Sequence, residues 1–80
     1  MNAKDAAAQR LKELCHERNI TLNEFANLSG VTPSTLYSIM DKKRRDISVL
    51  TIKKFCDGLE LSLAEFFDDR IFDDLEPEIQ

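Results

Sequence analysis

The chain has 80 residues, about half of the roughly 150 residues of a typical domain, so we expect one small domain and exclude a large enzyme. Apolar residues make up 42% and charged residues 32%, with two glycines and two prolines, a composition typical of a globular, helix-rich protein. No run approaches the roughly 18 apolar residues of a membrane span, and Asp5 interrupts the start before any apolar stretch. We therefore expect no secretory signal, no membrane partner and a cytoplasmic location.

The net charge of -4 is unevenly distributed along the chain. From Met1 to Cys56, ten lysines and arginines face six acids, a balance of +4, whereas from Asp57 to Gln80 one arginine faces nine acids, a balance of -8. Phosphate binding requires a local positive field. The acidic total therefore does not exclude a nucleic-acid partner for the first part of the chain.

The first 30 residues predict two helices. Apolar residues at helical spacing indicate one helix over residues 6–19, with His16 on its outward face. Thr21 and Glu24 have the spacing of a capping box, which predicts that the second helix begins at the next residue after Thr21. Gly30 ends this helix, because glycine adopts the left-handed C-cap conformation without a Cβ penalty.

The middle of the chain predicts two further helices with a basic loop between them. Thr32 can cap a third helix over Pro33–Met40, because proline is favoured at the first helical position. Residues 42–46 form the basic loop, and Ser48 can cap a fourth helix. The buried stripe of this fourth helix is expected to contain Val49, Ile52, Phe55, Cys56 and Leu59.

A second capping box, Ser62 and Glu65, predicts a fifth helix that extends through Phe67. No alternating strand pattern competes, so the predicted fold class is all-α. Beyond the fifth helix, an apolar stripe continues among acids, and it consists of Ile71, Phe72, Leu75 and Ile79. This stripe either folds onto the domain's own core or forms a dimer face, and the second interpretation is preferred.

The second and third predicted helices have the spacing of a helix-turn-helix, in which the second helix enters the major groove of DNA. Ala26 lies four residues before Gly30, and its small side chain lets the two helices cross closely. The apolar nucleus beneath the third helix is predicted to contain Phe25, Val31, Leu36 and Ile39. The opposite stripe of that helix is polar, and it consists of Ser34, Tyr37, Ser38 and Asp41.

The segment Thr21–Ile39, TLNEFANLSGVTPSTLYSI, resembles the helix-turn-helix of the phage repressor/Cro-type (XRE) family of bacterial and phage regulators. The resemblance covers about residues 7–67 and includes the basic loop, the fourth helix and the ending LSLAEFF. It implies a compact five-helix DNA-binding domain, usually dimeric, that binds palindromic operators and represses or otherwise regulates transcription. We expect this domain to span residues 1–67, with residues 68–80 as an acidic C-terminal extension used for packing or dimerisation.

The residues that match the family's base-reading face are Thr32, Pro33, Ser34, Tyr37 and Ser38. The face lacks Arg, Lys, Asn and Gln, whose bidentate bonds to bases are each worth about 1 to 3 kcal/mol of discrimination. Modest direct readout, supplemented by DNA shape and bridging water, is therefore expected. Tyr37 has two interpretations, because its ring can enter the groove or pack back against Met40 and the loop.

Affinity is then expected to depend on phosphate contacts. Lys42, Lys43, Arg44 and Arg45 directly follow the groove-facing helix, and Asn23 lies near the amide N-terminus of the second helix. The acidic C-terminal end would repel DNA, so we predict that it lies on the opposite side of the domain.

No residue set combines a nucleophile, a base and oxyanion donors, so we expect no enzyme activity, and we expect no cofactor, metal or small-molecule ligand. Cys15 and Cys56 are interpreted as reduced core thiols. The leading hypothesis is a sequence-specific DNA-binding repressor that acts as a homodimer on double-stranded DNA. The alternative is a protein-interaction module of the same fold, antitoxin-like or partner-bound, whose acidic, phenylalanine-rich end binds another protein.

Overall fold

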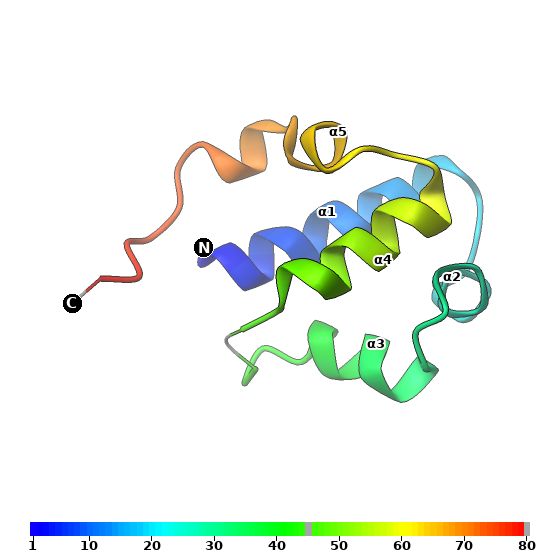
Figure 1. The fold of residues 1–80 in the computed structure, drawn as a ribbon. Coiled ribbons are helices and arrows are strands. Elements are labelled where there is room, and N and C mark those ends of the chain that lie inside the picture. The colour runs from blue at the N-terminus through cyan, green and yellow to red at the C-terminus, as the bar shows by residue number, and fades with distance from the viewer. Residues whose placement is uncertain (45, 80) are drawn as a thin grey trace.

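The computed structural model describes residues 1–44 and 46–79, which fold into five α-helices and one 3-10 turn. These elements are α1 (Ala3–Glu17), α2 (Leu22–Ser29), α3 (Pro33–Met40), α4 (Val49–Leu59), α5 (Leu63–Phe67) and the 3-10 turn η1 (Arg70–Phe72). In Figure 1, α1 and α4 lie between α3 on one side and α5 with η1 on the other. The all-α, five-helix prediction is confirmed.

Side-chain caps begin four of the helices where the sequence predicts them. Thr21, Thr32, Ser48 and Ser62 each accept a hydrogen bond from the backbone amide three residues later. The boxes at Thr21 and Ser62 are completed by glutamate side chains that accept from the capping residue's own amide. Gly30 ends α2 with φ of 72°, the left-handed conformation expected of it.

The first helix begins earlier than predicted, at Ala3 instead of residue 6, and it ends at Glu17. The cause is Asn2, whose Oδ1 accepts a hydrogen bond from the Asp5 amide at 2.8 Å and caps the helix. An asparagine followed three residues later by an acid was the sequence signal for this start.

The hydrophobic core contains side chains from each of the five α-helices. Its fully buried large side chains are Leu11, Phe25, Leu36, Ile39, Phe55, Cys56 and Phe66. The rings of Phe25 and Phe55 join α2 to α4, with their centroids 5.3 Å apart. Cys15 and Cys56 are buried free thiols, and burial raises the pKa of each. The interpretation of both as core residues is confirmed.

Val49 is 70% exposed, so its predicted place in the buried stripe of α4 is wrong. Val49 is the first residue of α4, and the chain packs Ile47, two residues earlier, against the core instead. The other four members of the stripe are buried.

Gly58 marks the close approach of α4 to α2. A Cβ atom at this position would lie 3.0 Å from the Cα atom of Ser29, which is shorter than ordinary van der Waals contact. The glycine therefore lets α4 pack directly on the end of the helix that precedes the turn.

The predicted apolar stripe beyond the fifth helix divides between the core and solvent. Phe72 packs against the core, and its ring lies 4.9 Å from that of Phe67. The Glu76 amide donates to the Met1 carbonyl at 3.1 Å, which ties the extension to the start of α1. Ile79 is 91% exposed. Phe72 thus folds onto the domain's own core, which is the first of the two interpretations, whereas Ile79 lies in solvent.

Candidate nucleic-acid interface

Buried apolar side chains pack α2 and α3 against the core, and a tight turn connects the two helices. Phe25, Ala26, Leu36 and Ile39 are buried, and Val31 packs against them. The Val31 amide donates to the Ala26 carbonyl at 3.2 Å, directly after the left-handed Gly30. This packing turns one face of α3 inward and leaves its other face to solvent.

The outward face of α3 carries hydroxyl groups. Pro33, Ser34, Tyr37 and Ser38 are all exposed, as is Thr35, which the sequence analysis left unassigned. Thr35 was detectable as a polar residue in the first turn of the helix, directly beside Ser34. The face is therefore polar and accessible, as expected, and it contains one more hydroxyl than predicted.

Thr32 serves first as the cap of α3. Its Oγ1 accepts a hydrogen bond from the Thr35 amide at 3.2 Å and donates to the Thr35 hydroxyl at 2.9 Å. The Ser34 hydroxyl lies 3.3 Å from the same oxygen. Three hydroxyls thus form one small network at the N-terminal end of the helix, where the helix dipole favours negative charge.

Tyr37 leans toward α2 and not toward Met40. Its phenol donates to Asn23 Oδ1 at 3.3 Å, and the residue is 52% exposed. This bond brings together one side chain predicted to contact bases and one predicted to contact phosphate. The start of α2 and the middle of α3 therefore form a continuous polar surface.

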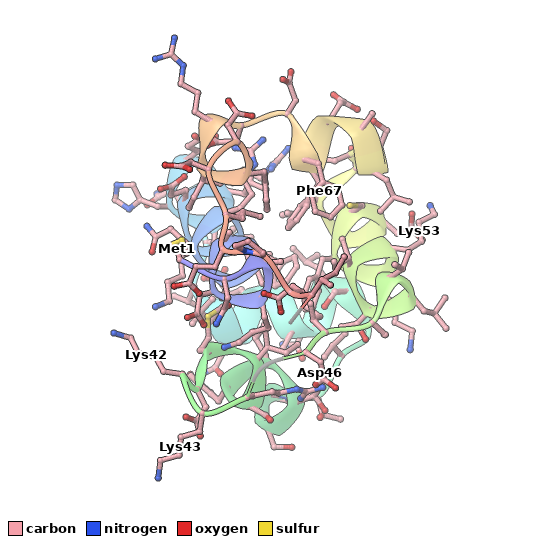
Figure 2. All side chains as sticks on the ribbon, turned by 90° about the vertical axis from the view of Figure 1, so that its left-hand side faces the viewer. Met1, Lys42, Lys43, Asp46, Lys53 and Phe67 are labelled. Atoms are coloured by element: carbon pink, nitrogen blue, oxygen red, sulfur yellow. The ribbon has the colours of Figure 1, made fainter. Side chains whose placement is uncertain are left out.

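The basic loop contains two different kinds of cation. Arg44 folds back on α3, because its Nη1 donates to the Ser38 hydroxyl at 3.0 Å and its Nε donates to the Asp46 carbonyl at 3.1 Å. Lys42 and Lys43 are exposed, and Figure 2 shows both side chains extending from the loop. Neither ammonium group forms an ion pair with residues 1–44 or 46–79. Arg45, also predicted to bind phosphate, lies outside the described residues.

A buried lysine that the sequence analysis did not single out fixes the C-terminal end of α3. The Lys4 side chain on α1 is only 1% exposed. Its Nζ donates to the Ile39 carbonyl at 3.0 Å and to the Asp41 carbonyl at 2.8 Å, and it pairs with Asp5 at 2.9 Å. A cation is stabilising at the negative end of the helix dipole, so Lys4 holds α3 at its C-terminal end.

The first part of the acidic C-terminal region, α5 with η1, lies away from this surface. Figure 1 shows α5 and η1 on the side of α1 and α4 opposite to α3. Arg10 on α1 ties this end down, since its guanidinium donates to the Glu65 and Phe66 carbonyls at 3.0 and 2.8 Å. Asp69 completes the contact with an ion pair to the same arginine at 3.2 Å.

The described residues contain no helix of the length and apolarity needed to cross a bilayer. Within the same residues, no three His, Cys, Asp or Glu side chains gather as a metal site.

Comparison with known proteins gives two similarities. Residues 10–70 match the family model described as Cro/C1-type HTH DNA-binding domain. The fold is similar to the crystal structure of the prophage Lp1 protein 11, with a TM-score of 0.82 and 28% sequence identity. That similarity covers 94% of this chain and 100% of the prophage protein's chain. A comparison with curated proteins found no significant match.

Proposed function

The chain belongs to the Cro/C1-type HTH DNA-binding domain family, and from this premise we propose that it is a regulator that represses transcription by occupying operator DNA. In this proposal α3 lies in the major groove, and its base-reading residues are Thr32, Pro33, Ser34, Tyr37 and Ser38. The observation that carries the proposal is the exposed, hydroxyl-lined face of α3, followed directly in the chain by two exposed lysines that form no ion pair with residues 1–44 or 46–79. Both can touch a duplex at the same time.

The phosphate contacts are assigned to two groups of residues. Lys42 and Lys43 are the primary contacts, because their ammonium groups are exposed and carry no ion pair with the described residues. Asn23 contributes with the amide N-terminus of α2, which attracts anions. Arg44 and Arg45 complete the set, but Arg44 must exchange its bonds to the loop for a phosphate.

We also propose that the chain acts as a homodimer. Two copies of α3 related by a two-fold axis would lie about 34 Å apart, one turn of DNA, so the operator would be a pseudo-palindrome. Val49 and Leu50 support such an interface, because they are large, exposed apolar side chains at the start of α4. Sedimentation at micromolar concentration is expected to show a dimer that Leu50→Glu dissociates. A monomer at every concentration would contradict the homodimer.

The salt dependence of DNA binding tests the phosphate contacts. Four to six neutralised phosphates per dimer predict that log affinity falls with log salt at a slope of about -4 to -5. Replacing Lys42 and Lys43 by Gln is expected to reduce the magnitude of this slope by about 3 to 4, since each lost phosphate contact contributes about 0.9. Arg70→Gln is the matched control, because Arg70 is exposed on η1, on the side opposite to α3.

Selection of bound sequences from random duplex DNA, at two salt concentrations, tests the sequence preference. We expect a pseudo-palindromic motif that becomes weaker when Ser34 and Tyr37 are replaced by Ala. An unchanged motif in these variants would contradict the assigned reading face. If DNA affinity changes neither with salt concentration nor on replacement of Lys42 and Lys43, the regulator proposal is contradicted and the alternative of a protein-interaction module is favoured.

A further inference from the structure

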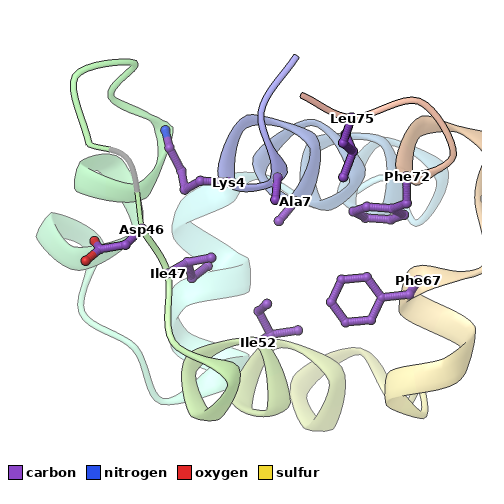
Figure 3. Close-up of a pocket in the computed structure, with 9 residues that line it drawn as sticks. Lys4, Ala7, Asp46, Ile47, Ile52, Phe67, Phe72 and Leu75 are labelled. Atoms are coloured by element: carbon purple, nitrogen blue, oxygen red, sulfur yellow. The ribbon is translucent and has the colours of Figure 1, made fainter. Parts of the chain in front are cut away.

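A groove of about 380 Å³ lies between α1, the start of α4 and the C-terminal region. Its apolar lining includes Ala7, Ile47, Ile52, Phe67, Phe72 and Leu75. Figure 3 shows these side chains arranged around an open space, with the two phenylalanine rings forming one end. None of the lining residues belongs to α3 or to the DNA contacts proposed above.

The polar lining groups do not point into the groove. Figure 3 shows the Lys4 nitrogen and the Asp46 carboxylate directed away from the apolar side chains. The Lys4 ammonium instead donates hydrogen bonds to the Ile39 and Asp41 carbonyls. Small-molecule sites orient their ligands with a few convergent polar groups. A groove without such groups is instead suited to apolar side chains from another protein.

The part of the chain that supplies three of the apolar lining residues is acidic. Asp68 follows Phe67, Asp73 follows Phe72, and Leu75 lies between Asp74 and Glu76; all four acids, which we call the rim, are exposed. Residues 57–80 carry a balance of -8, with Arg70 as their one cation. The groove thus has an apolar floor, part of which comes from a strongly acidic segment of the chain.

We propose that this groove binds a segment of a different protein that presents two or three apolar side chains flanked by Lys or Arg. A helix with apolar residues at positions i, i+3 and i+4 satisfies this requirement, because they lie on one face while the basic residues lie beside them. Charge complementarity selects this occupant. A second copy of this chain would bring its own acidic end against the rim, and like charges at an interface are unfavourable.

Two synthetic peptides with the same apolar spacing test the proposal. One is a 14-residue Leu/Lys amphipathic helix, and the other replaces every Lys by Glu. The full chain is expected to bind the Leu/Lys peptide at least tenfold more tightly, as measured by fluorescence anisotropy at 0.15 M salt. Its binding is expected to shift the backbone amide signals of Ile47, Ile52 and Phe72. Equal affinity for the two peptides, or signals that shift only elsewhere, would overturn the proposal.

Two variants separate the groove from general attraction to an acidic protein. Ala3 lines the groove but is exposed, so Ala3→Trp fills the space from a position that tolerates a large side chain. This variant is expected to weaken peptide binding at least tenfold, whereas Ala64→Trp, at an exposed position of α5 outside the lining, leaves it unchanged. Similar weakening by both variants would contradict the site.

Neutralising the rim and measuring self-association complete the test. Asp73→Asn with Asp74→Asn is expected to weaken the Leu/Lys peptide several-fold and to leave DNA affinity unchanged or higher. If Ala3→Trp instead dissociates a dimer of the chain in sedimentation experiments, the groove is occupied by a second copy and the proposal fails. DNA binding is measured on the same variants, so this failure is distinguishable from a failure of the regulator proposal.

Discussion

Lys4 and Arg10 bind opposite ends of the molecule from the same helix, and they do so in different surroundings. Lys4 donates to the carbonyls at the end of α3, and Arg10 donates to those at the end of α5. The Lys4 side chain is buried, whereas that of Arg10 borders solvent. The bond from Lys4 to the Ile39 carbonyl is buried, whereas the bonds from Arg10 to the Phe66 and Glu65 carbonyls are part-buried and exposed, so water can replace Arg10 more readily. The same chemical device should therefore hold the end of the molecule that carries α3 more firmly than the end that carries α5.

The largest expected effect follows from Lys4→Met, which keeps the length of the side chain and removes the ammonium. It leaves the Ile39 carbonyl buried without its partner, so we expect the free energy of unfolding to fall by about 2 to 3 kcal/mol. Urea unfolding measures this loss, and Lys12→Met on the exposed side of α1 is the control, expected to change stability by less than about 0.5 kcal/mol. Equal losses would contradict the special role of Lys4. DNA affinity should also fall in Lys4→Met, because α3 loses an anchor.

Arg10→Ala should have a smaller effect, because its carbonyls lie nearer to solvent. We expect a loss of roughly 1 to 2 kcal/mol in urea unfolding, since charge-assisted bonds are lost but water replaces part of them. Arg10→Lys is expected to restore less than half, because one ammonium cannot reproduce the fork that reaches Glu65, Phe66 and Asp69. DNA affinity should stay unchanged in both variants. If Arg10→Ala lowered DNA affinity as much as Lys4→Met, the proposed difference between the two ends of the molecule would be contradicted.

The N-caps of α3 and α5 allow the same comparison at the level of one hydroxyl. Thr32→Ala and Ser62→Ala should each cost about 1 kcal/mol of stability, because each leaves a helix amide without its side-chain partner. DNA affinity at matched folded fraction should fall only for Thr32→Ala. Thr32→Ser retains the hydroxyl and should keep both properties close to those of the original chain. A DNA defect in Ser62→Ala would argue against the assignment of the two ends.

The smallest effect concerns the pH dependence of the capping box on α5. Hydrogen bonds from Ser62, chiefly from its backbone amide, lower the pKa of Glu65 below its usual range. Since the folded-state pKa is depressed, this contribution to stability is present above the unfolded pKa of about 4.3 and is lost as pH falls through the folded value. Glu65→Gln should therefore weaken the acid-induced loss of stability slightly. An NMR titration that gives Glu65 a pKa at or above the usual range would contradict this expectation.

Local sequence signals specified most of the helix ends. Thr21, Gly30, Thr32 and Ser62 each act through atoms within a few residues along the chain, so their effects were predictable from spacing alone. Val49 was wrongly predicted to be buried. Helical periodicity identifies the apolar face of a helix, but it does not show whether the first turn of that face extends past the neighbouring elements into solvent.

The contacts of the charged residues were much less predictable. Lys4 lies 35 residues from Ile39 in the chain, and Arg10 lies 56 residues from Phe66, so no local pattern indicates either contact. From the sequence alone, Lys42 and Arg44 were both predicted to contact phosphate. In the structure the Lys42 side chain extends into solvent, whereas Arg44 folds back on Ser38 and Asp46. The difference depends on Ser38 and Asp46, which come within reach only after the loop has folded. The exposed polar face of α3 was thus predictable, while the contacts of the individual cations beside it were not.

The way in which α3 is attached has a consequence for how such a domain changes its target. Lys4 grips main-chain carbonyls, and Leu36 and Ile39 provide the inward contacts, so neither attachment depends on the side chains at positions 34, 35 and 37. Those three positions can be recoded while the scaffold keeps its shape. Under the proposed role of α3, new operator preferences are therefore accessible by exchanging a few outward residues, without any compensating change in the core.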